Sequence, residues 1–312
     1  MKALLTGASS FSGLWLARAL TEKGVDVVAP LRADVSSYTG VRQMRVKALG
    51  SVATVVPRIE FGSPEFLALI DKADYDLFCH HAAYVADYRS ADFDVNRALA
   101  ENTREFKKLS ERLASHAVAA VILTGSVFES DEGAGTSPRR AFSPYGLSKS
   151  LTASVIRYWC EMARLPLGKF VIANPFGPFE EPRFCAYLIK TWVSGEVAEI
   201  RTPRYVRDNI HVSLLAKAYA RFAIETARAK KSDRYAPSFY VESQGSFADR
   251  FANEIGQRVK IPCRVRVGTQ VDFSEPMVRI NTDAINLALL DWSEPAAWDE
   301  LVAYYRDAFG LR

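Results

Sequence analysis

Tyr145 and Lys149 stand four residues apart, just after Ser143-Pro144. On a helix this spacing places both side chains on one face, and proline is common in the first turn of a helix. A neighbouring ammonium lowers the pKa of a tyrosine from about 10 towards working pH, so the phenol can exchange a proton with an alcohol oxygen while hydride moves. The spacing predicts a proton-transfer site, although it also describes an ordinary pair on a helix surface.

Hydroxyl groups lie upstream of this pair, in Leu123-Thr124-Gly125-Ser126. They follow the apolar run Val118–Thr124, which predicts a buried strand. In parallel α/β sheets, ligands bind at the carboxyl edge of the strands. Thr124 and Ser126 are therefore candidates to share a site with Tyr145 and Lys149.

The segment from Thr6 to Gly13 follows an apolar run and precedes a run with helical spacing. Peptide N–H groups at a helix N-terminus carry partial positive charge, so a pyrophosphate binds there when glycines let the backbone approach. Gly7 suits the tight turn and Gly13 the packing of helix on strand, whereas the middle position, usually glycine, is Ser10. We predict that a dinucleotide binds at Gly7, Ser9, Ser10, Phe11 and Gly13.

The identity of the cofactor depends on the end of the second predicted strand, where NAD-dependent proteins carry an acidic residue for the ribose 2′-hydroxyl. Leu31 and Arg32 occupy that place here. A neutral residue followed by arginine suits a 2′-phosphate, so we expect NADP(H), with NAD as the alternative. The competing interpretation is that Arg32 is a solvated loop cation.

Apolar runs alternate with amphipathic stretches along the first half of the chain. Strands are predicted at 3–5, 25–31, 51–56, 75–78, 118–124 and 169–173, and helices at 14–20, 66–70, 96–114 and 145–164. This alternation predicts an α/β fold with a Rossmann-type, doubly wound parallel sheet. Prolines and glycines interrupt the rhythm after Asn174. We place a dinucleotide-binding domain at 1–174 plus roughly 206–242, and a smaller C-terminal substrate-binding lobe at 175–205 and 243–312.

Composition excludes several classes of protein. The 312 residues are 49% hydrophobic, enough for a large core, and a net charge of +4 is too small for a nucleic-acid footprint. The four cysteines form no CxxC pair, so neither a disulfide framework nor a metal site is expected. No apolar run is long enough for a membrane span or a signal core. We expect a cytoplasmic protein that acts on a small molecule and binds neither nucleic acid nor membrane.

Together these motifs resemble those of the extended short-chain dehydrogenases/reductases of the NAD-dependent epimerase/dehydratase family, many of which act on nucleotide sugars. The glycine turn is similar to the family's TGxxGxxG with one substitution, and Tyr145 and Lys149 match its YxxxK. Further similar segments are DxxxHxAA at 76–83, NxxGP at 174–178, RDxxHV at 207–212 and the closing segment at 279–292. The likeness runs through nearly the whole chain.

The resemblance implies roles on the cofactor side. The family's catalytic hydroxyl falls on Thr124, with Ser126 as the nearby alternative, and would orient a substrate oxygen against Tyr145. Lys149 would also hold the nicotinamide ribose, as part of the cofactor site together with Tyr145. The cofactor-side strand brings in three further residues: His80, Ala82 and Ala83.

On the substrate side, the resemblance points to three residues. Arg207 matches the residue that grips the nucleotide diphosphate, a role that suits a bidentate guanidinium. Asn174 matches the residue at the floor of the sugar pocket. Cys185 lies where some epimerases place acid–base groups, although a free cysteine more often packs as a small hydrophobe.

The expected reaction depends on a position where this sequence differs from part of the family. Family 4,6-dehydratases carry Asp-Glu directly after the catalytic threonine, where this chain has Gly125-Ser126. Together with the expected NADP(H), this favours a reductase that consumes its cofactor. We therefore expect a 4-ketoreductase of a nucleotide-linked sugar, with a 4-epimerase or a reductase of a small non-sugar carbonyl as alternatives. A non-catalytic dinucleotide sensor is disfavoured because Thr124, Tyr145 and Lys149 are all present.

Two further expectations come from the resemblance. The family's NxxGT is replaced by the segment 99–103, so Asn96 or Asn102 would take over the contacts of its asparagine. The family also suggests a homodimer, formed through the helices at 96–114 and 145–164.

Overall fold

The sheet begins with the apolar run before the glycine turn. In the computed structural model, which describes residues 1–135 and 140–310, this run is strand β1 (Lys2–Thr6). Parallel neighbours on its two sides are β2 (Asp26–Leu31) and β4 (Leu77–His80). The sheet also includes β3 (Thr54–Pro57), β5 (Ala120–Ser126), β7 (Leu167–Ile172) and β11 (Asp233–Tyr235). Its order is β11-β7-β5-β4-β1-β2-β3, all parallel, which confirms the predicted Rossmann-type sheet.

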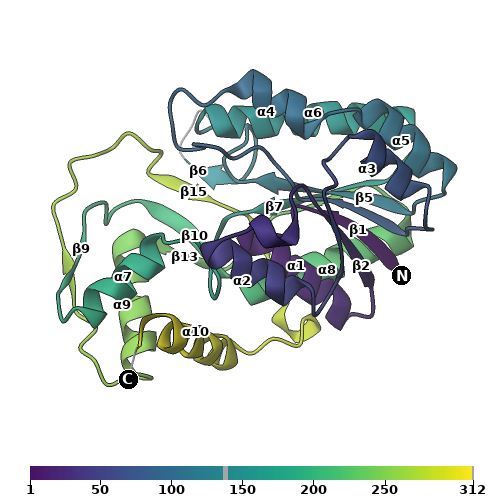
Figure 1. The fold of residues 1–312 in the computed structure, drawn as a ribbon. Coiled ribbons are helices and arrows are strands. Elements are labelled where there is room, and N and C mark those ends of the chain that lie inside the picture. The colour runs from purple at the N-terminus through teal and green to yellow at the C-terminus, as the bar shows by residue number, and fades with distance from the viewer. Residues whose placement is uncertain (136–139, 311–312) are drawn as a thin grey trace. The chain divides into compact units, whose positions relative to one another are not determined.

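Helices cover both faces of this sheet (Figure 1). One face carries α3 (Pro64–Ile70), α4 (Val95–Asn102), α5 (Phe106–Ser115) and α6 (Pro144–Met162). The other carries α1 (Phe11–Glu22), α2 (Gly40–Leu49) and α8 (Val212–Ala229). A short 3₁₀ turn, η1 (Val35–Ser37), precedes α2. Beneath α3, α5 and α6 lies an apolar core that includes Phe66, Phe78, Leu109 and Ile156.

The prediction of a single helix at 96–114 was wrong, because the chain forms two helices there, α4 and α5. The Thr103 hydroxyl bonds back to the carbonyl of Leu99, and Glu105 adopts a left-handed conformation with φ of 53°. A residue in that region interrupts the right-handed backbone. The apolar periodicity continues through the break and therefore gave no sign of it.

The chain folds as two compact units, each made of three stretches of sequence. The first comprises 1–132, 139–172 and 216–236, and the second 133–138, 173–215 and 237–312. Residues from roughly 206 to 242 were predicted to belong to the dinucleotide-binding domain. Strand β10 (Val206–His211) instead lies in the second unit, because its backbone pairs with β8 (Asn174–Phe176), β13 (Tyr240–Ser243) and β15 (Val278–Ile280).

The second unit is built around these strands and a core of aromatic side chains. Its other strands are β6 (Ala134–Gly135), β9 (Ala198–Ile200), β12 (Pro237–Ser238), β14 (Val265–Val267) and β16 (Asp283–Ala284). Its helices are α7 (Phe184–Val193), α9 (Gln244–Gly256), the 3₁₀ turn η2 (Leu287–Leu289) and α10 (Glu294–Phe309). Phe176, Trp192, Phe251 and Trp298 are buried at the centre of its core.

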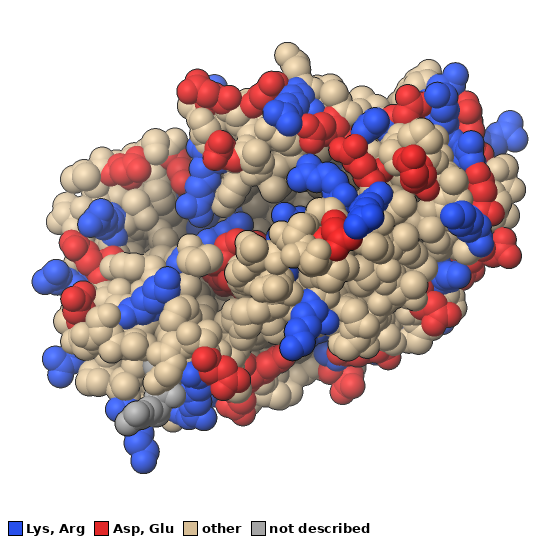
Figure 2. All heavy atoms as spheres, viewed as in Figure 1, with Lys and Arg blue, Asp and Glu red and all other residues tan. Residues whose placement is uncertain are grey.

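Charged residues of both signs are interspersed over the face seen in Figure 2. Within 1–135 and 140–310, no helix has the length and apolarity needed to cross a bilayer.

Candidate active site

The glycine turn is shaped by two positions that have no room for a side chain. Gly7 has φ of +74°, and a Cβ there would lie 2.7 Å from the backbone nitrogen of Ala82. A Cβ on Gly13 would lie 2.2 Å from the carbonyl oxygen of Gly7. Ser10, at the usual middle glycine, caps α1, since its hydroxyl accepts a hydrogen bond from Gly13 N at 3.1 Å. The substitution therefore leaves the turn and the helix start intact.

The end of β4 is tied to this turn through Thr6. The Thr6 hydroxyl accepts the backbone N–H groups of His81 and Ala82, each at 3.1 Å. The His80 ring lies between Thr6 Oγ1, at 3.1 Å, and the carbonyl of Asn102, at 3.0 Å. Burial lowers the pKa of His80 to about 3, so its ring is neutral and its contacts are structural.

Asn102 performs the bracing that the sequence analysis left open between Asn96 and Asn102. Asn102 is buried, accepts Tyr84 N at 2.7 Å and donates to the Thr152 hydroxyl at 3.2 Å, whereas Asn96 is exposed. The carbonyl of Asn102 also binds His80. These contacts link α4 to the loop after β4 and to α6.

His81 joins the glycine turn to Thr124. Its Nδ1 lies 3.0 Å from Thr124 Oγ1, and its Nε2 lies 3.0 Å from Ser12 Oγ and 3.2 Å from Ser10 Oγ. Burial, with the charge of Lys149, lowers the pKa of His81 to about 3, so the ring is neutral. The hydroxyl expected to face a substrate is thus also a partner of an imidazole. No motif in the sequence predicted these contacts of His81.

The proton-transfer pair lies in the first turns of α6. Ser143 caps this helix by accepting Gly146 N at 3.2 Å. The Tyr145 ring is surrounded edge-on by the rings of Tyr88, Phe93 and Phe128, with centroids 5.6, 5.9 and 6.4 Å away.

Lys149 is buried one turn beyond, and its Nζ donates to the Thr124 carbonyl at 2.7 Å. Burial lowers the pKa of Lys149, and the nearby charge of Lys169 adds to this effect while Glu129 opposes it. The fold therefore brings Thr124 and Lys149 together. Ser126 is partly exposed, and its hydroxyl accepts Phe128 N at 3.2 Å.

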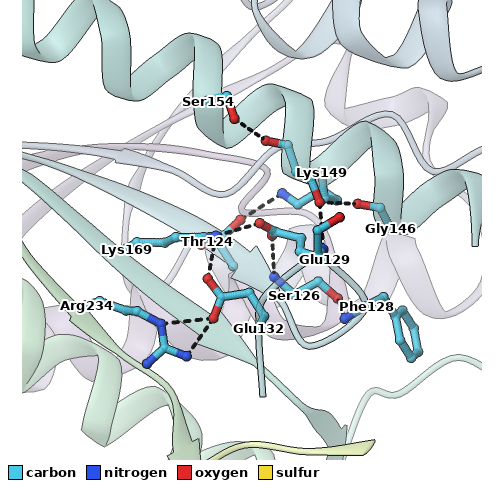
Figure 3. A network of polar contacts seen from close by, with 12 residues as sticks. Thr124, Ser126, Phe128, Glu129, Glu132, Gly146, Lys149, Ser154, Lys169 and Arg234 are labelled. Carbon is cyan, nitrogen blue, oxygen red and sulfur yellow. Dashed lines mark hydrogen bonds and ion pairs between the residues drawn. The ribbon is translucent and has the colours of Figure 1, made fainter. Parts of the chain in front are cut away.

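A buried ion network lies beside Lys149 (Figure 3). Lys169 on β7 donates to Glu129 and to Glu132, at 2.6 Å each, and Glu132 also pairs with Arg234 at 2.6 Å. The second oxygen of Glu129 accepts Ser126 N at 2.7 Å. Thus the loop after β5 is anchored by charges in a region with little water.

The same network fills the space at Gly125. A Cβ there would lie 2.8 Å from Lys169 Cε and 3.0 Å from Glu129 Oε1. An aspartate at this position, as in the family's dehydratases, has no room beside the present side chains.

At the end of β2, Arg32 is exposed. The nearest following acidic residue, Asp34, has both carboxylate oxygens engaged. One accepts Ser36 N at 3.0 Å and Ser36 Oγ at 2.7 Å, and the other pairs with Arg58 at 2.7 Å. Hydrogen bonds from Ser36 and Arg58 lower the pKa of Asp34, which is therefore ionised and committed locally.

In the second unit, two arginines stand at paired positions of adjacent strands. Arg207 on β10 lies opposite Arg279 on β15. Burial, with the charge of Arg207, lowers the pKa of Arg279. Arg207 forms an ion pair with Glu275 at 2.7 Å and donates to the carbonyl of Pro276 at 3.0 Å. Arg279 begins the closing segment at 279–292, for which the sequence predicted no role.

The other two predicted substrate residues lie on separate elements. Asn174 begins β8 and donates to the carbonyl of Asp208 at 3.3 Å. Cys185, on α7, is 2% exposed inside the apolar core of the second unit, and burial raises its pKa well above the ordinary value. Its thiol therefore belongs to the packing of that core.

The family model "NAD dependent epimerase/dehydratase family" matches residues 3–236. No curated protein matches the sequence. A UDP-glucuronic acid 4-epimerase variant from Bacillus cereus, solved with a fluorinated UDP-sugar and NAD, is 17% identical with a TM-score of 0.78, covering 99% of this chain and 100% of that one.

Two further solved structures show the same fold. Thermus thermophilus UDP-glucose 4-epimerase with NAD is 17% identical with a TM-score of 0.72, covering 99% of this chain and 100% of that one. The dTDP-glucose 4,6-dehydratase DesIV from Streptomyces venezuelae is 17% identical with a TM-score of 0.71, covering 99% and 98%. The family model spans well over half of the sequence, and the parallel sheet, the glycine turn and the Tyr145–Lys149 helix lie within it. This chain belongs to the NAD-dependent epimerase/dehydratase family of short-chain dehydrogenases/reductases.

Proposed function

We propose that the protein is a nucleotide-sugar 4-epimerase that moves hydride at a sugar carbon with a nicotinamide dinucleotide. The observation that carries the proposal is the buried Lys149 ammonium, fixed on the Thr124 carbonyl one helical turn from Tyr145. Solved 4-epimerases with 17% identity share the fold, and this similarity ranks epimerisation ahead of the ketoreduction that the motifs alone favoured.

Tyr145 would act as the base that takes the proton of a sugar hydroxyl and as the acid that returns it. Lys149 favours the phenolate of Tyr145 because an ammonium nearby stabilises the negative charge. The hydroxyl of Thr124, held in place by His81, would accept or donate a hydrogen bond at the reacting oxygen. A bound dinucleotide would accept the hydride and return it.

The glycine turn fits such a cofactor. Gly13 N is taken by Ser10, and Leu14 N bonds to the Ser10 carbonyl, so the first-turn N–H groups of Phe11 and Ser12 are the ones aimed at a pyrophosphate. Because Gly7 and Gly13 have no Cβ, the turn can pack closely on the backbone of Ala82 and the start of α1 can pack on the carbonyl of Gly7. Ala82 and Ala83 would border the nicotinamide side. His80, which the resemblance also placed at the cofactor, is 1% exposed, and its ring bonds to Thr6 and to the carbonyl of Asn102 instead.

Substrate recognition would fall to the second unit. Arg207 and Arg279, on adjacent strands, would bind the diphosphate of a nucleotide, since two guanidiniums match two phosphates. Glu275 would then exchange its pairing with Arg207 for solvent. Asn174 would contact the sugar.

A second candidate function, 4-ketoreduction, is favoured by the residues at the end of β2, where the adenosine ribose of the cofactor is expected. Leu31 stands where NAD-dependent proteins carry an acidic residue, with Arg32 next to it, and Asp34 is committed to Ser36 and Arg58. We therefore propose NADP(H) as the cofactor, with NAD as the alternative. A reductase consumes one reduced cofactor per turnover, whereas an epimerase consumes none.

The deciding experiment incubates the protein with UDP- and dTDP-linked hexoses and with their 4-keto derivatives. An epimerase converts the first set with no net change in absorbance at the reduced-nicotinamide band. A reductase converts only the keto sugars and oxidises NADPH in equal amount. Tyr145→Phe should lose turnover by orders of magnitude while still binding cofactor. Conversion of neither set by the wild type, with intact cofactor binding, would refute the nucleotide-sugar assignment.

We further propose a homodimer formed through α6 and the neighbouring α4–α5 segment. Leu147, Leu151, Tyr158 and Met162 are exposed along α6, at spacings of four, seven and four residues that form one stripe. An apolar stripe on a helix surface favours contact with a second apolar surface.

A further inference from the structure

Arg42, in the first turn of α2, reaches back to the glycine turn. Its Nη2 lies 2.9 Å and its Nε 3.3 Å from Ser9 Oγ, across 33 residues of sequence. Its guanidinium carbon also lies 5.2 Å from the centre of the Tyr38 ring. Ser9 and Tyr38 are buried, at 3% and 8% exposure, whereas Arg42 is exposed. A fixed cation thus faces solvent at the edge of the turn.

The position of this cation follows from the strand register. Leu4 on β1 lies opposite Val28 on β2, so three residues further on Gly7 comes level with Leu31. The glycine turn and the end of β2 therefore lie side by side. In Rossmann folds the adenosine ribose lies between these two points, with its 2′ group towards the end of β2.

Charge at this place favours a phosphate over a hydroxyl. Asp34 is the first acidic residue after β2. Its two carboxylate oxygens already bind Ser36 and Arg58, so they are not positioned to accept a hydrogen bond from a ribose hydroxyl. An arginine carries five N–H donors, and the bonds to Ser9 need only two of them. The rest of the planar fork matches the oxygens of a phosphate.

We propose that Arg42, anchored on Ser9 and Tyr38, binds the 2′-phosphate of NADP(H) and, more than Arg32, discriminates it from NAD. This inference rests on the dinucleotide site of the proposed function but on none of its sugar chemistry. Arg42 ranks above Arg32 because its guanidinium is already held in place, which lowers the entropy lost on binding. Arg32 would supply a second, less ordered charge.

The test uses cofactor halves, so that it is independent of catalysis. Isothermal titration measures the affinity of the full chain for 2′,5′-ADP and for 5′-AMP, which differ at the 2′ position. Arg42→Ala should weaken the affinity for 2′,5′-ADP roughly 10- to 100-fold, as expected for losing hydrogen bonds to a charged group. It should change the affinity for 5′-AMP by no more than about 3-fold. Lys47→Ala, an exposed cation in the last turn of the same helix, serves as the control for loss of charge.

Two further variants separate binding from folding. Arg42→Lys keeps the charge but loses the fork, so it should retain part of the 2′,5′-ADP affinity. Ser9→Ala keeps the guanidinium but loses its anchor, so it should weaken 2′,5′-ADP by a smaller factor than Arg42→Ala. Melting temperatures within about 2 °C of wild type would show that the turn is intact.

Three results would overturn the inference. If Arg42→Ala lost affinity for 2′,5′-ADP and for 5′-AMP by the same factor, Arg42 would only shape the glycine turn. Wild-type protein that binds 2′,5′-ADP no more tightly than 5′-AMP would refute the phosphate site and leave the proposed function standing. Failure of the wild type to bind either ligand would refute the dinucleotide site itself, and with it the proposed function.

Discussion

Replacing Lys169 by methionine should expose how strongly the buried network depends on one cation. The side chains of Lys169, Glu129 and Glu132 are 10%, 1% and 7% exposed, so removal of the ammonium leaves carboxylates in a region with little water. Breaking a buried pair by deleting one partner costs about 3–5 kcal/mol. Arg234 still pairs with Glu132, and Ser126 N still bonds to Glu129, which favours the lower end of that range.

A loss of about 3 kcal/mol lowers the melting temperature of a unit of this size by roughly 6–12 °C. Urea unfolding at pH 7 gives the free energy, and calorimetry gives the melting temperature. Lys107→Met is the matched control, because Lys107 and Glu111 form an exposed pair, 60% and 61% exposed, whose loss should cost within about 1 kcal/mol. The double variant Glu129→Gln/Lys169→Met should recover much of the loss, because the amide oxygen still accepts Ser126 N and no charge is left unpaired.

The pH dependence follows from Glu132. Burial raises its pKa, but hydrogen bonds from Arg234 and the charge and hydrogen bond of Lys169 outweigh burial, so the pKa lies below its ordinary value of 4.5. A lowered folded-state pKa stabilises the protein above pH 4.5, and this stabilisation is lost as pH falls through the folded value. The difference in the free energy of unfolding between wild type and Lys169→Met should therefore become smaller at acid pH. This reasoning would be refuted if Lys169→Met were no less stable than Lys107→Met. It would also be refuted if Glu129→Gln/Lys169→Met were less stable than Lys169→Met.

Three further outcomes are expected. Gly7→Ala should lose dinucleotide affinity by more than about 10-fold in a fluorescence titration, because alanine is strained at φ of +74° and its Cβ would clash with backbone at 2.7 Å; unchanged affinity would contradict the assigned cradle. Gly125→Asp should displace the Lys169 side chain and destabilise the fold by about 1–3 kcal/mol in urea without creating dehydratase activity; a dehydrated product would refute the argument from space. Tyr158→Glu combined with Met162→Glu should shift the mass in light scattering towards the monomer, and an unchanged mass would exclude this stripe as the interface.

Much of the sheet was predictable because its strands are short apolar runs bounded by turns. The glycine turn and the α6 start, with Pro144 after a capping Ser143, follow local rules that a sequence displays directly. The family resemblance, confirmed by the family model, then fixed the fold class. What remained uncertain at this level was Ser10, whose capping hydrogen bond to Gly13 N explains why the turn tolerates it.

Contacts between distant side chains were not predictable in the same way. Arg42 meets Ser9 across 33 residues, and Lys169 meets Glu129 across 40, without any periodic signal. His81 is followed by two alanines and belongs to no motif position that predicts a contact, yet its ring joins Ser12 to Thr124. Cys185 carried a resemblance-based role, but in the structure it lies on α7 inside the apolar core of the second unit.

The interleaving of the two units also has a consequence for how the chain is made. The sheet of the first unit ends with β11, which pairs with β7 but follows it by 61 residues, counting from Ile172 to Asp233. During synthesis, six strands are available once β7 has left the ribosome, while the outer edge of β7 stays without its partner until β11 emerges. An open strand edge invites pairing with other chains. Nascent chains halted between 172 and 233 should therefore be the species that most needs a chaperone.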